Sequence, residues 1–252
     1  MGFIITIFNE LLYRPLFNAL VLLYEYIPGA DLGIAIIILT ILIKLLFYPL
    51  GTKSIKSQKS LTELQPKIKE LQEKYKNDKE KQTKELMELY KKEKINPFSG
   101  CLPILIQLPV LIAMYRVFWG GLEPSRLSLL YSFIPSPGEI SSMFLGFIDL
   151  ARSTSFIAEN GVKIYLWQNI FLVLLVGILQ FLQMKFISPK TQKKTNDFSS
   201  QMQKQMMYFM PVFIVVIFWS LPSALSLYIL TTTLFTIVQQ YIITKKAYVE
   251  PK

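Results

Sequence analysis

The feature that most constrains this chain is the separation of its apolar residues from its charged ones. Of its 252 residues, 52% are hydrophobic, yet the formal net charge is +10. The apolar residues lie in long runs, and most of the lysines lie in blocks between those runs. This arrangement is typical of a polytopic membrane protein. A basic protein that binds nucleic acid would instead place its lysines along one groove of an ordinary domain.

Five runs are predicted to span the membrane. The last apolar stretch, residues 206–243, contains no charged residue. As one helix it would be roughly 57 Å long, nearly twice the thickness of a hydrocarbon core. It is therefore predicted to form two helices with a turn at Pro222. The predicted spans are residues 29–50, 101–121, 164–187, 206–221 and 223–243.

The distribution of basic residues predicts the orientation. Residues 51–100 contain 13 lysines, and further lysines lie in the loop of residues 188–205 and in the tail, residues 244–252. Residues 121–162 have only two arginines against four acidic residues. Since basic loops stay in the cytoplasm, the N-terminus is predicted to be outside and the C-terminus in the cytoplasm. Residues 122–163 then form an extracytoplasmic loop.

Residues 1–28 are too polar for a clean span, because Glu10, Arg14 and Pro15 interrupt their apolar residues. We expect an amphipathic helix on the extracytoplasmic surface of the membrane. A sixth span is the alternative. The N-terminus has neither a basic start nor a small-residue cleavage site, so no removable signal peptide is expected.

Residues 51–100 are predicted to form a cytoplasmic helical hairpin. Their apolar side chains recur at intervals of three and four residues, as they do along a seam between paired helices. The turn-forming sequence Lys76-Asn77-Asp78 interrupts the seam. A solvated, charged linker is the alternative, but a linker has no need of an apolar seam. The first half of the seam consists of Leu61, Leu64, Ile68, Leu71 and Tyr75.

The composition excludes several kinds of chemistry. There is no histidine, so histidine-dependent catalysis and imidazole metal ligation are impossible. The single cysteine, Cys101, excludes an intramolecular disulfide. The apolar cores of the predicted spans contain no Asp or Glu, which removes an intramembrane aspartyl protease and disfavours a carboxylate proton relay. The sequence shows no nucleophile–base pair, metal cluster or phosphate loop, so we expect no enzyme activity, cofactor or metal.

Lys44 is the most informative single residue. An ionisable side chain within a span costs about 2.5–3.5 kcal/mol on insertion scales, and such side chains usually face a water-filled cavity or a partner. Because Lys44 lies near the end of its span, its ammonium could instead snorkel to the membrane surface. Thr40 lies one turn away on the same helix face and favours the water-filled cavity.

Other predicted spans also contain polar side chains. Gln107 lies in the second span, Gln180 and Gln183 share a face of the third, and residues 231–233 are threonines of the fifth. Each of them alone is explained by a hydrogen bond between helices. Together with Lys44 they predict one hydrophilic hollow, open to the cytoplasm, whose cation would attract acidic or polar segments.

Several segments resemble the YidC-type membrane protein insertases of bacteria and related organelles. In chain order they are ILTILIKLLFYPL, LQPKIKELQEKYKND, KELMELYKKEKINPFSGCLPILIQLPV, FLGFIDL, MMYFMPVFIVVIFWSLPSALSLYIL and TIVQQ. The resemblance covers most of residues 10–243. It implies an all-α integral membrane protein with five transmembrane helices, a cytoplasmic helical hairpin and a groove open to the cytoplasm and to lipid. With the amphipathic surface helix at the N-terminus, this is the expected fold.

In that family a positive residue of the first core span, usually arginine, draws the polar part of a client protein into the groove. The matching residue here is Lys44, which keeps the charge but lacks the planar fork that grips a carboxylate. We expect neither the large periplasmic domain nor the lipoprotein-type signal of some relatives. The resemblance further assigns groove or client contacts to Thr40, Gln107, Gln180, Gln183, Trp219 and Tyr228.

The predicted function is non-covalent insertion of membrane proteins in the bacterial cytoplasmic membrane. Expected partners are nascent hydrophobic membrane proteins and membrane lipid. Further candidates are the ribosome, the signal-recognition-particle receptor and a Sec translocon. No specific nucleic-acid sequence and no small-molecule substrate are expected. The alternatives are a small-anion transporter or channel, in which Lys44 binds the anion, and an assembly chaperone that packs membrane subunits without inserting them.

Overall fold

The computed structural model describes residues 2–96, 102–120, 128–157, 161–187 and 198–249, and this part of the chain is mostly helical. The helical class predicted from the sequence is therefore confirmed. The helices are α1 (Gly2–Phe8), a π-helix η1 (Asn9–Tyr13), α2 (Arg14–Tyr26), α3 (Leu32–Leu46), α4 (Tyr48–Lys74), α5 (Lys79–Lys92), α6 (Leu102–Gly120), α7 (Trp167–Ile187), α8 (Phe198–Phe218) and α9 (Ser223–Val249).

Two short β-hairpins interrupt the otherwise helical fold. The strands are β1 (Met143–Phe144), β2 (Ile148–Asp149), β3 (Ser155–Ile157) and β4 (Lys163–Tyr165). β1 pairs with β2 and β3 with β4, both antiparallel. β1, β2 and β3 lie in the predicted extracytoplasmic loop and β4 extends from it into the predicted third span, and an all-α fold did not include them. Strands of two or three residues are too short for an alternating pattern to reveal them in the sequence.

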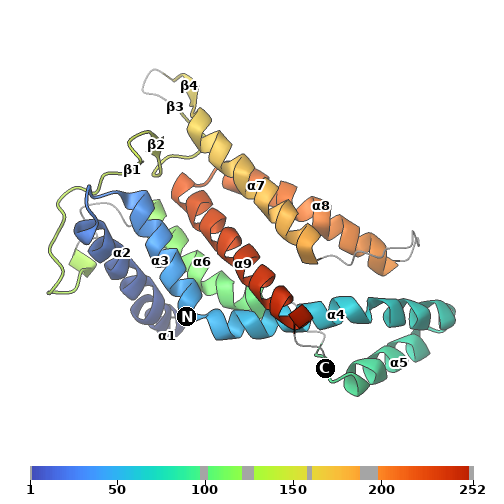
Figure 1. The fold of residues 1–252 in the computed structure, drawn as a ribbon. Helices are drawn as coiled ribbons and strands as arrows, with labels where there is room; N and C mark the ends of the chain where they lie inside the picture. Colours follow the sequence, from blue (N-terminus) through green and yellow to red (C-terminus); the bar gives the residue numbers. More distant parts are fainter. Residues whose placement is uncertain (1, 97–101, 121–127, 158–160, 188–197, 250–252) are drawn as a thin grey trace.

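Helix α9 lies at the centre of the bundle, between α3 and α6 on one side and α7 and α8 on the other (Figure 1). All residues from Pro222 to Ile229 are buried. Tyr228 belongs to the same buried cluster as Ile36 of α3, Val117 of α6 and Val173 of α7. The first turns of α9 are enclosed by neighbouring helices, so their polar side chains need partners on those helices or in enclosed water.

The outside of the bundle is apolar. Val212 and Val216 of α8 are 62% and 65% exposed, and Phe171 of α7 is 67% exposed. A continuous apolar surface of this kind marks contact with lipid or with another protein. In the described residues, α7 and α9 are long and apolar enough to span a membrane, and α3 with α4 forms a third candidate across a 69° bend. The count of five spans stays a prediction.

The helix bounds differ from the predicted spans at several points, among them the end of α9, which continues to Val249 in the predicted tail. The first span includes a bend at Phe47, because α3 ends at Leu46 and Pro49 lies in the first turn of α4, where proline is tolerated. The third helix starts at Trp167, since the preceding residues form β4. The fourth helix starts at Phe198, within the segment predicted as a loop of residues 188–205.

The N-terminal segment packs against the bundle along one face of α2. Phe17 and Leu20 are fully buried, and α2 contacts both α3 and α6. Asn18 fastens α2 to a later loop, because its Nδ2 donates to the carbonyl of Leu129 at 3.1 Å and its Oδ1 accepts from the Tyr131 amide at 2.7 Å. The position of residues 1–28 on the membrane surface remains a prediction.

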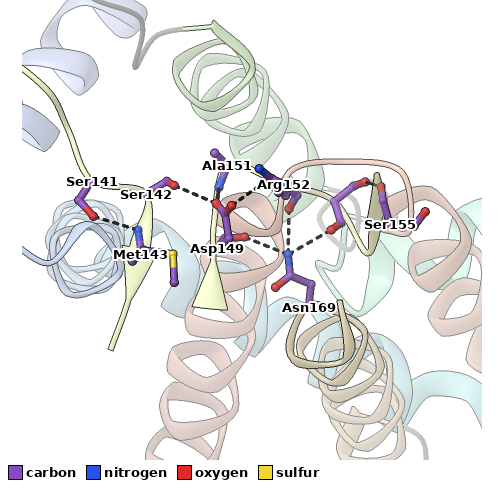
Figure 2. A network of polar contacts seen from close by, with 9 residues as sticks. Ser141, Ser142, Met143, Asp149, Ala151, Arg152, Ser155 and Asn169 are labelled. Carbon is purple, nitrogen blue, oxygen red and sulfur yellow. Dashed lines mark hydrogen bonds and ion pairs between the residues drawn. The ribbon is translucent and has the colours of Figure 1, made fainter. Parts of the chain in front are cut away.

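A group of polar contacts, which we call the cap network, closes the end of the bundle where α7 and α9 begin (Figure 2). The buried Asn169 donates from Nδ2 to the carbonyls of Asp149, Arg152 and Ser153 at 2.9, 3.1 and 3.1 Å. Arg152 Nε pairs with Asp149 Oδ2 at 3.0 Å. The Ser223 amide donates to the Arg152 carbonyl at 2.9 Å, so the loop also supplies an acceptor to the first turn of α9.

Helices α4 and α5 extend away from the bundle (Figure 1). Asp78 begins α5 as its N-cap, accepting from the Lys81 amide at 3.0 Å. Lys67 Nζ lies 2.6 Å from Glu93 Oε1 and joins the two helices. This hydrogen bond and the charge of Lys67 lower the pKa of the Glu93 carboxyl. Leu64, one of the residues of the predicted seam, is buried. The cytoplasmic location of these helices remains a prediction.

Candidate functional site

Lys44 and Gln107 line one small cavity beside the bend at Phe47. We call it the Lys44 cavity. Its volume is about 50 Å³, which is enough for a few water molecules. The structure therefore brings together two of the polar side chains predicted to share a hollow. The lining residues are Ile43, Lys44, Phe47, Leu50, Gly51, Gln107, Val110 and Gln239.

The ammonium group of Lys44 faces helix α9. Its Nζ donates to Thr236 Oγ1 at 3.3 Å. The neighbouring residues Leu45 and Leu46 are 53% and 74% exposed, so the apolar residues after Lys44 face outward while its charge faces the bundle. Lys44 makes no ion pair with an acidic side chain in the described part of the chain. The site thus holds a cation whose charge is not neutralised there.

Gln107 connects α6 to α9 next to this cation. Its Nε2 donates to the hydroxyl of Tyr228, a side chain with no exposed surface. A buried phenol is stable only when its hydroxyl has a partner, and Gln107 supplies one. The polar side of the cavity is therefore built from three helices, α3, α6 and α9.

Gln239 holds the start of α4 against α9. It is 5% exposed, and its Nε2 donates to the Tyr48 carbonyl and to Thr52 Oγ1, each at 3.1 Å. Gly51 makes this approach possible, because a Cβ at that position would lie 3.1 Å from the same nitrogen. The bend between α3 and α4 is thus fixed by a residue that also lines the Lys44 cavity.

Five of the seven predicted groove residues do not line the Lys44 cavity: Thr40, Gln180, Gln183, Trp219 and Tyr228. Gln180 Nε2 donates to Thr233 Oγ1 at 3.3 Å and so joins α7 to α9. Gln183 is half-buried on the same helix. Thr40 is 1% exposed, and its hydroxyl donates to the Ile36 carbonyl at 2.6 Å within α3. Their contacts with a client remain predictions.

Trp219 lies at the other end of the bundle. It follows α8 in the turn before α9, and its carbonyl accepts from the Thr154 hydroxyl at 2.8 Å, close to the cap network. From Ser223 to Thr236, helix α9 rises roughly 20 Å. The structure therefore does not bring Trp219 to the Lys44 cavity, and a shared contact with one client would need a client segment that follows α9.

Two residues of this site, Thr236 and Gln239, were not among the predicted site residues. Both have a detectable signal. Thr236 follows Thr232 by one helical turn and lies on the same face. Gln239 is the first glutamine of the segment TIVQQ, a polar pair within an apolar run. In the described residues, no group of three His, Cys, Asp or Glu could hold a metal ion.

Known sequences resemble this chain over most of its length. The profile of a family described as 60Kd inner membrane protein matches residues 22–250. Proteins from Syntrophus aciditrophicus and Fusobacterium nucleatum are each 38% identical to the chain, over 236 and 216 residues. A protein from Francisella tularensis subsp. novicida is 41% identical over 213 residues. All three relatives are named membrane protein insertase YidC.

The three relatives differ in length. The matches cover 94%, 86% and 84% of this chain, in the order just given. They cover 87% of the Fusobacterium protein but only 37% of the Syntrophus protein and 32% of the Francisella protein. The chain therefore spans about a third of the length of the Syntrophus and Francisella proteins and most of the length of the Fusobacterium protein.

Proposed function

The chain belongs to the YidC family, and on that premise we propose that it is a membrane protein insertase of a bacterial membrane. Its clients are nascent membrane proteins with a hydrophobic segment and a polar tail. The activity is non-covalent: the protein lowers the free-energy barrier for moving the polar tail across the bilayer. The ribosome, the signal-recognition-particle receptor and a Sec translocon are proposed as partners that deliver or receive such clients.

We propose five spans, with the N-terminus outside and the C-terminus in the cytoplasm. The 13 lysines of residues 51–100 support this orientation, because α4 and α5 are then cytoplasmic. The Lys44 cavity adjoins the bend at Phe47, from which α4 leaves the bundle. In this orientation, the cavity lies at the cytoplasmic end, where a client's tail arrives.

The observation that most supports the mechanism is the position of the Lys44 ammonium. It donates to Thr236 inside the bundle and has no acidic partner among the described side chains. An unneutralised cation in a medium of low dielectric attracts an acidic or polar segment more strongly than the same cation does in water. Lys44 thus supplies the initial attraction for the client's tail.

The size of the cavity sets the next step. At about 50 Å³ it accommodates a few waters but no polypeptide segment. A client must therefore separate helices around the cavity, and the contacts between Gln107 and Tyr228 and between Lys44 and Thr236 are the polar ones that would open. The client's polar groups can replace those hydrogen bonds, which keeps the cost of opening low.

Reconstitution in liposomes tests the insertase proposal. The full chain is placed in liposomes, a single-span client with a short acidic tail is added, and protease protection reports the translocated tail. We expect protection with the wild-type protein and a marked loss with Lys44→Ala. Lys53→Ala, which removes an exposed lysine just after the bend, is the matched control and should behave as wild type. Equal protection in empty liposomes would contradict insertion.

The small volume of the Lys44 cavity favours a second candidate, a carrier or channel for a small anion. A cation in a cavity of about 50 Å³ fits a small anion better than a peptide. An anion-flux assay on the same liposomes, without client, separates the two functions. Flux that depends on Lys44, together with unassisted client insertion, would replace the insertase proposal. An assembly chaperone predicts neither flux nor a change in tail protection.

A further inference from the structure

A larger polar cavity lies apart from the Lys44 cavity, and the proposed insertion mechanism does not use it. Its volume is about 360 Å³, and it lies where η1 and the start of α2 meet α6 and residues 128–129. The lining residues are Asn9, Glu10, Tyr13, Arg14, Arg116, Ser128 and Leu129. Two guanidinium groups and one carboxylate therefore border it, an excess of one positive charge.

Arg116 is held in place by groups of the N-terminal segment. One of its terminal nitrogens donates to Asn9 Oδ1 at 2.6 Å. Its guanidinium carbon lies 4.7 Å from the ring centre of Tyr13 and 5.8 Å from that of Phe8. Stacking on aromatic rings leaves the edge of a guanidinium available for hydrogen bonds.

Arg14 is held in a similar way. Its Nε donates to the Leu129 carbonyl at 3.2 Å, and NH1 lies 3.3 Å from Glu10 Oε2. Its guanidinium carbon lies 5.0 Å from the ring centre of Tyr131. In the described part of the chain, the remaining terminal nitrogen, NH2, of Arg14 and of Arg116 makes no hydrogen bond. Two oriented guanidinium groups beside one cavity suit the oxygens of a phosphate.

The surface of the same segment is apolar and exposed. Phe3, Ile7 and Leu11 follow one another at intervals of four residues and therefore share a helix face. They are 78%, 41% and 71% exposed. Trp119, one turn beyond Tyr115 on α6, is 59% exposed and its ring packs on that of Tyr115. Exposed apolar residues beside tryptophan and tyrosine are typical of the boundary between acyl chains and headgroups.

We propose that the cavity between Arg14 and Arg116 binds the phosphate of an anionic phospholipid, whose acyl chains lie on the face of Phe3, Ile7 and Leu11. A free phosphate shares the headgroup chemistry, but only a lipid uses the apolar face. The π-helix η1 places Asn9 and Tyr13 against Arg116, so the bound lipid also fastens the N-terminal segment to α6. In the proposed topology, the site lies in the outer leaflet.

Native mass spectrometry of the purified full chain, delipidated in detergent, tests this site. The probes are phosphatidylglycerol, diacylglycerol with the same acyl chains, and inorganic phosphate. Phosphatidylglycerol should bind at least about tenfold more tightly than either other probe. Arg14→Gln and Arg116→Gln should each weaken it by about tenfold, the usual effect of losing a charge-assisted hydrogen bond. Arg152→Gln removes an equal charge from the cap network and should change the affinity less than about twofold.

Each result decides the proposal. Equal losses in Arg14→Gln, Arg116→Gln and Arg152→Gln would show non-specific charge attraction and overturn it. Equal affinity for diacylglycerol would exclude the phosphate contact, and equal affinity for inorganic phosphate would exclude the lipid. If Arg116→Gln fails to fold, two other variants test the site. Arg14→Gln keeps the contacts of Arg116, and Arg116→Lys keeps the positive charge at position 116. The lipid-binding measurement contains no client protein. Lipid binding can therefore be observed even if the insertase proposal fails, and insertion can be observed even if lipid binding fails.

Discussion

Two polar regions, one at the start of helix α9 and one beside its middle, are built in opposite ways. In the cap network, one buried amide, Asn169, serves three carbonyls, and the Arg152 carbonyl also accepts from the first turn of α9. In the Lys44 cavity, a cation has one 3.3 Å hydrogen bond to a hydroxyl and space beside it. Most polar groups of the cap network are paired, although the buried Oγ of Ser223 has no partner among the described residues, whereas the cavity retains space for another molecule. The first region is therefore structural, and the second is suited to binding.

The largest effect is expected from Asn169→Asp. The substitution keeps the shape but turns a carboxylate toward three carbonyl oxygens. Burying an unpaired charge in this way should lower the free energy of unfolding by about 3 kcal/mol or more. Thermal unfolding in detergent measures it. Gln168→Glu, the same chemical change at the exposed neighbouring residue, is the control. Similar losses of unfolding free energy in both variants would show that the loss does not come from the hydrogen bonds of Asn169 in the cap network.

Lys44→Glu should affect insertion more than stability. The reversed charge repels a client's acidic tail, and we expect the insertion rate to fall about tenfold, equivalent to about 1.4 kcal/mol in the barrier. Lys44→Arg should retain most of the rate because it keeps the charge. Lys53→Glu serves as the control for charge reversal at an exposed site. Normal insertion of acidic-tailed clients by Lys44→Glu would show that the charge of Lys44 has no role in the mechanism.

The hydrogen bond between Gln107 and Tyr228 should contribute about 1 kcal/mol. A double-mutant cycle with Gln107→Leu and Tyr228→Phe isolates that contribution, because each variant removes one partner and keeps a similar volume. Unfolding free energies of the four proteins give the coupling. A coupling near zero would mean that the pair is already open in the membrane, and would extend the binding region to Tyr228.

The smallest effect is expected from the exposed pair of Lys67 and Glu93, which belongs neither to the cap network nor to the Lys44 cavity. Because the folded chain lowers the pKa of Glu93, the pair stabilises the contact between α4 and α5 above the ordinary carboxyl pKa. That stabilisation is lost as the pH falls below 4.5 and through the lowered pKa. Hydrogen exchange of α5 at several pH values measures it. Glu93→Gln should remove the pH dependence, while Glu88→Gln should not.

The sequence predicted the helices better than the contacts between their ends. Apolar runs and lysine blocks located α3, α6, α7 and α9, because burial and lipid contact both require long apolar segments. The partner of Lys44 could not be predicted, since Thr236 lies 192 residues away along the chain. The same limit applies to Asn9 and Arg116, which lie 107 residues apart.

The bend and the cap network show two different limits. Pro49 was a visible signal that a new helix begins after Phe47, but the apolar residues on both sides favoured one continuous span. The cap network had no such signal. Asn169 gains its role only because the loop after β2 brings several carbonyls around its amide, and no periodic pattern in the sequence encodes that arrangement.

The bend at Phe47 makes α4 a lever arm. Its 27 residues extend roughly 40 Å from a pivot that Gln239 clamps beside Lys44. A rotation of about 10° at the pivot displaces the far end by about 7 Å at this length. A small change in the bend that Gln239 holds would therefore appear as a much larger displacement at the tip of α4.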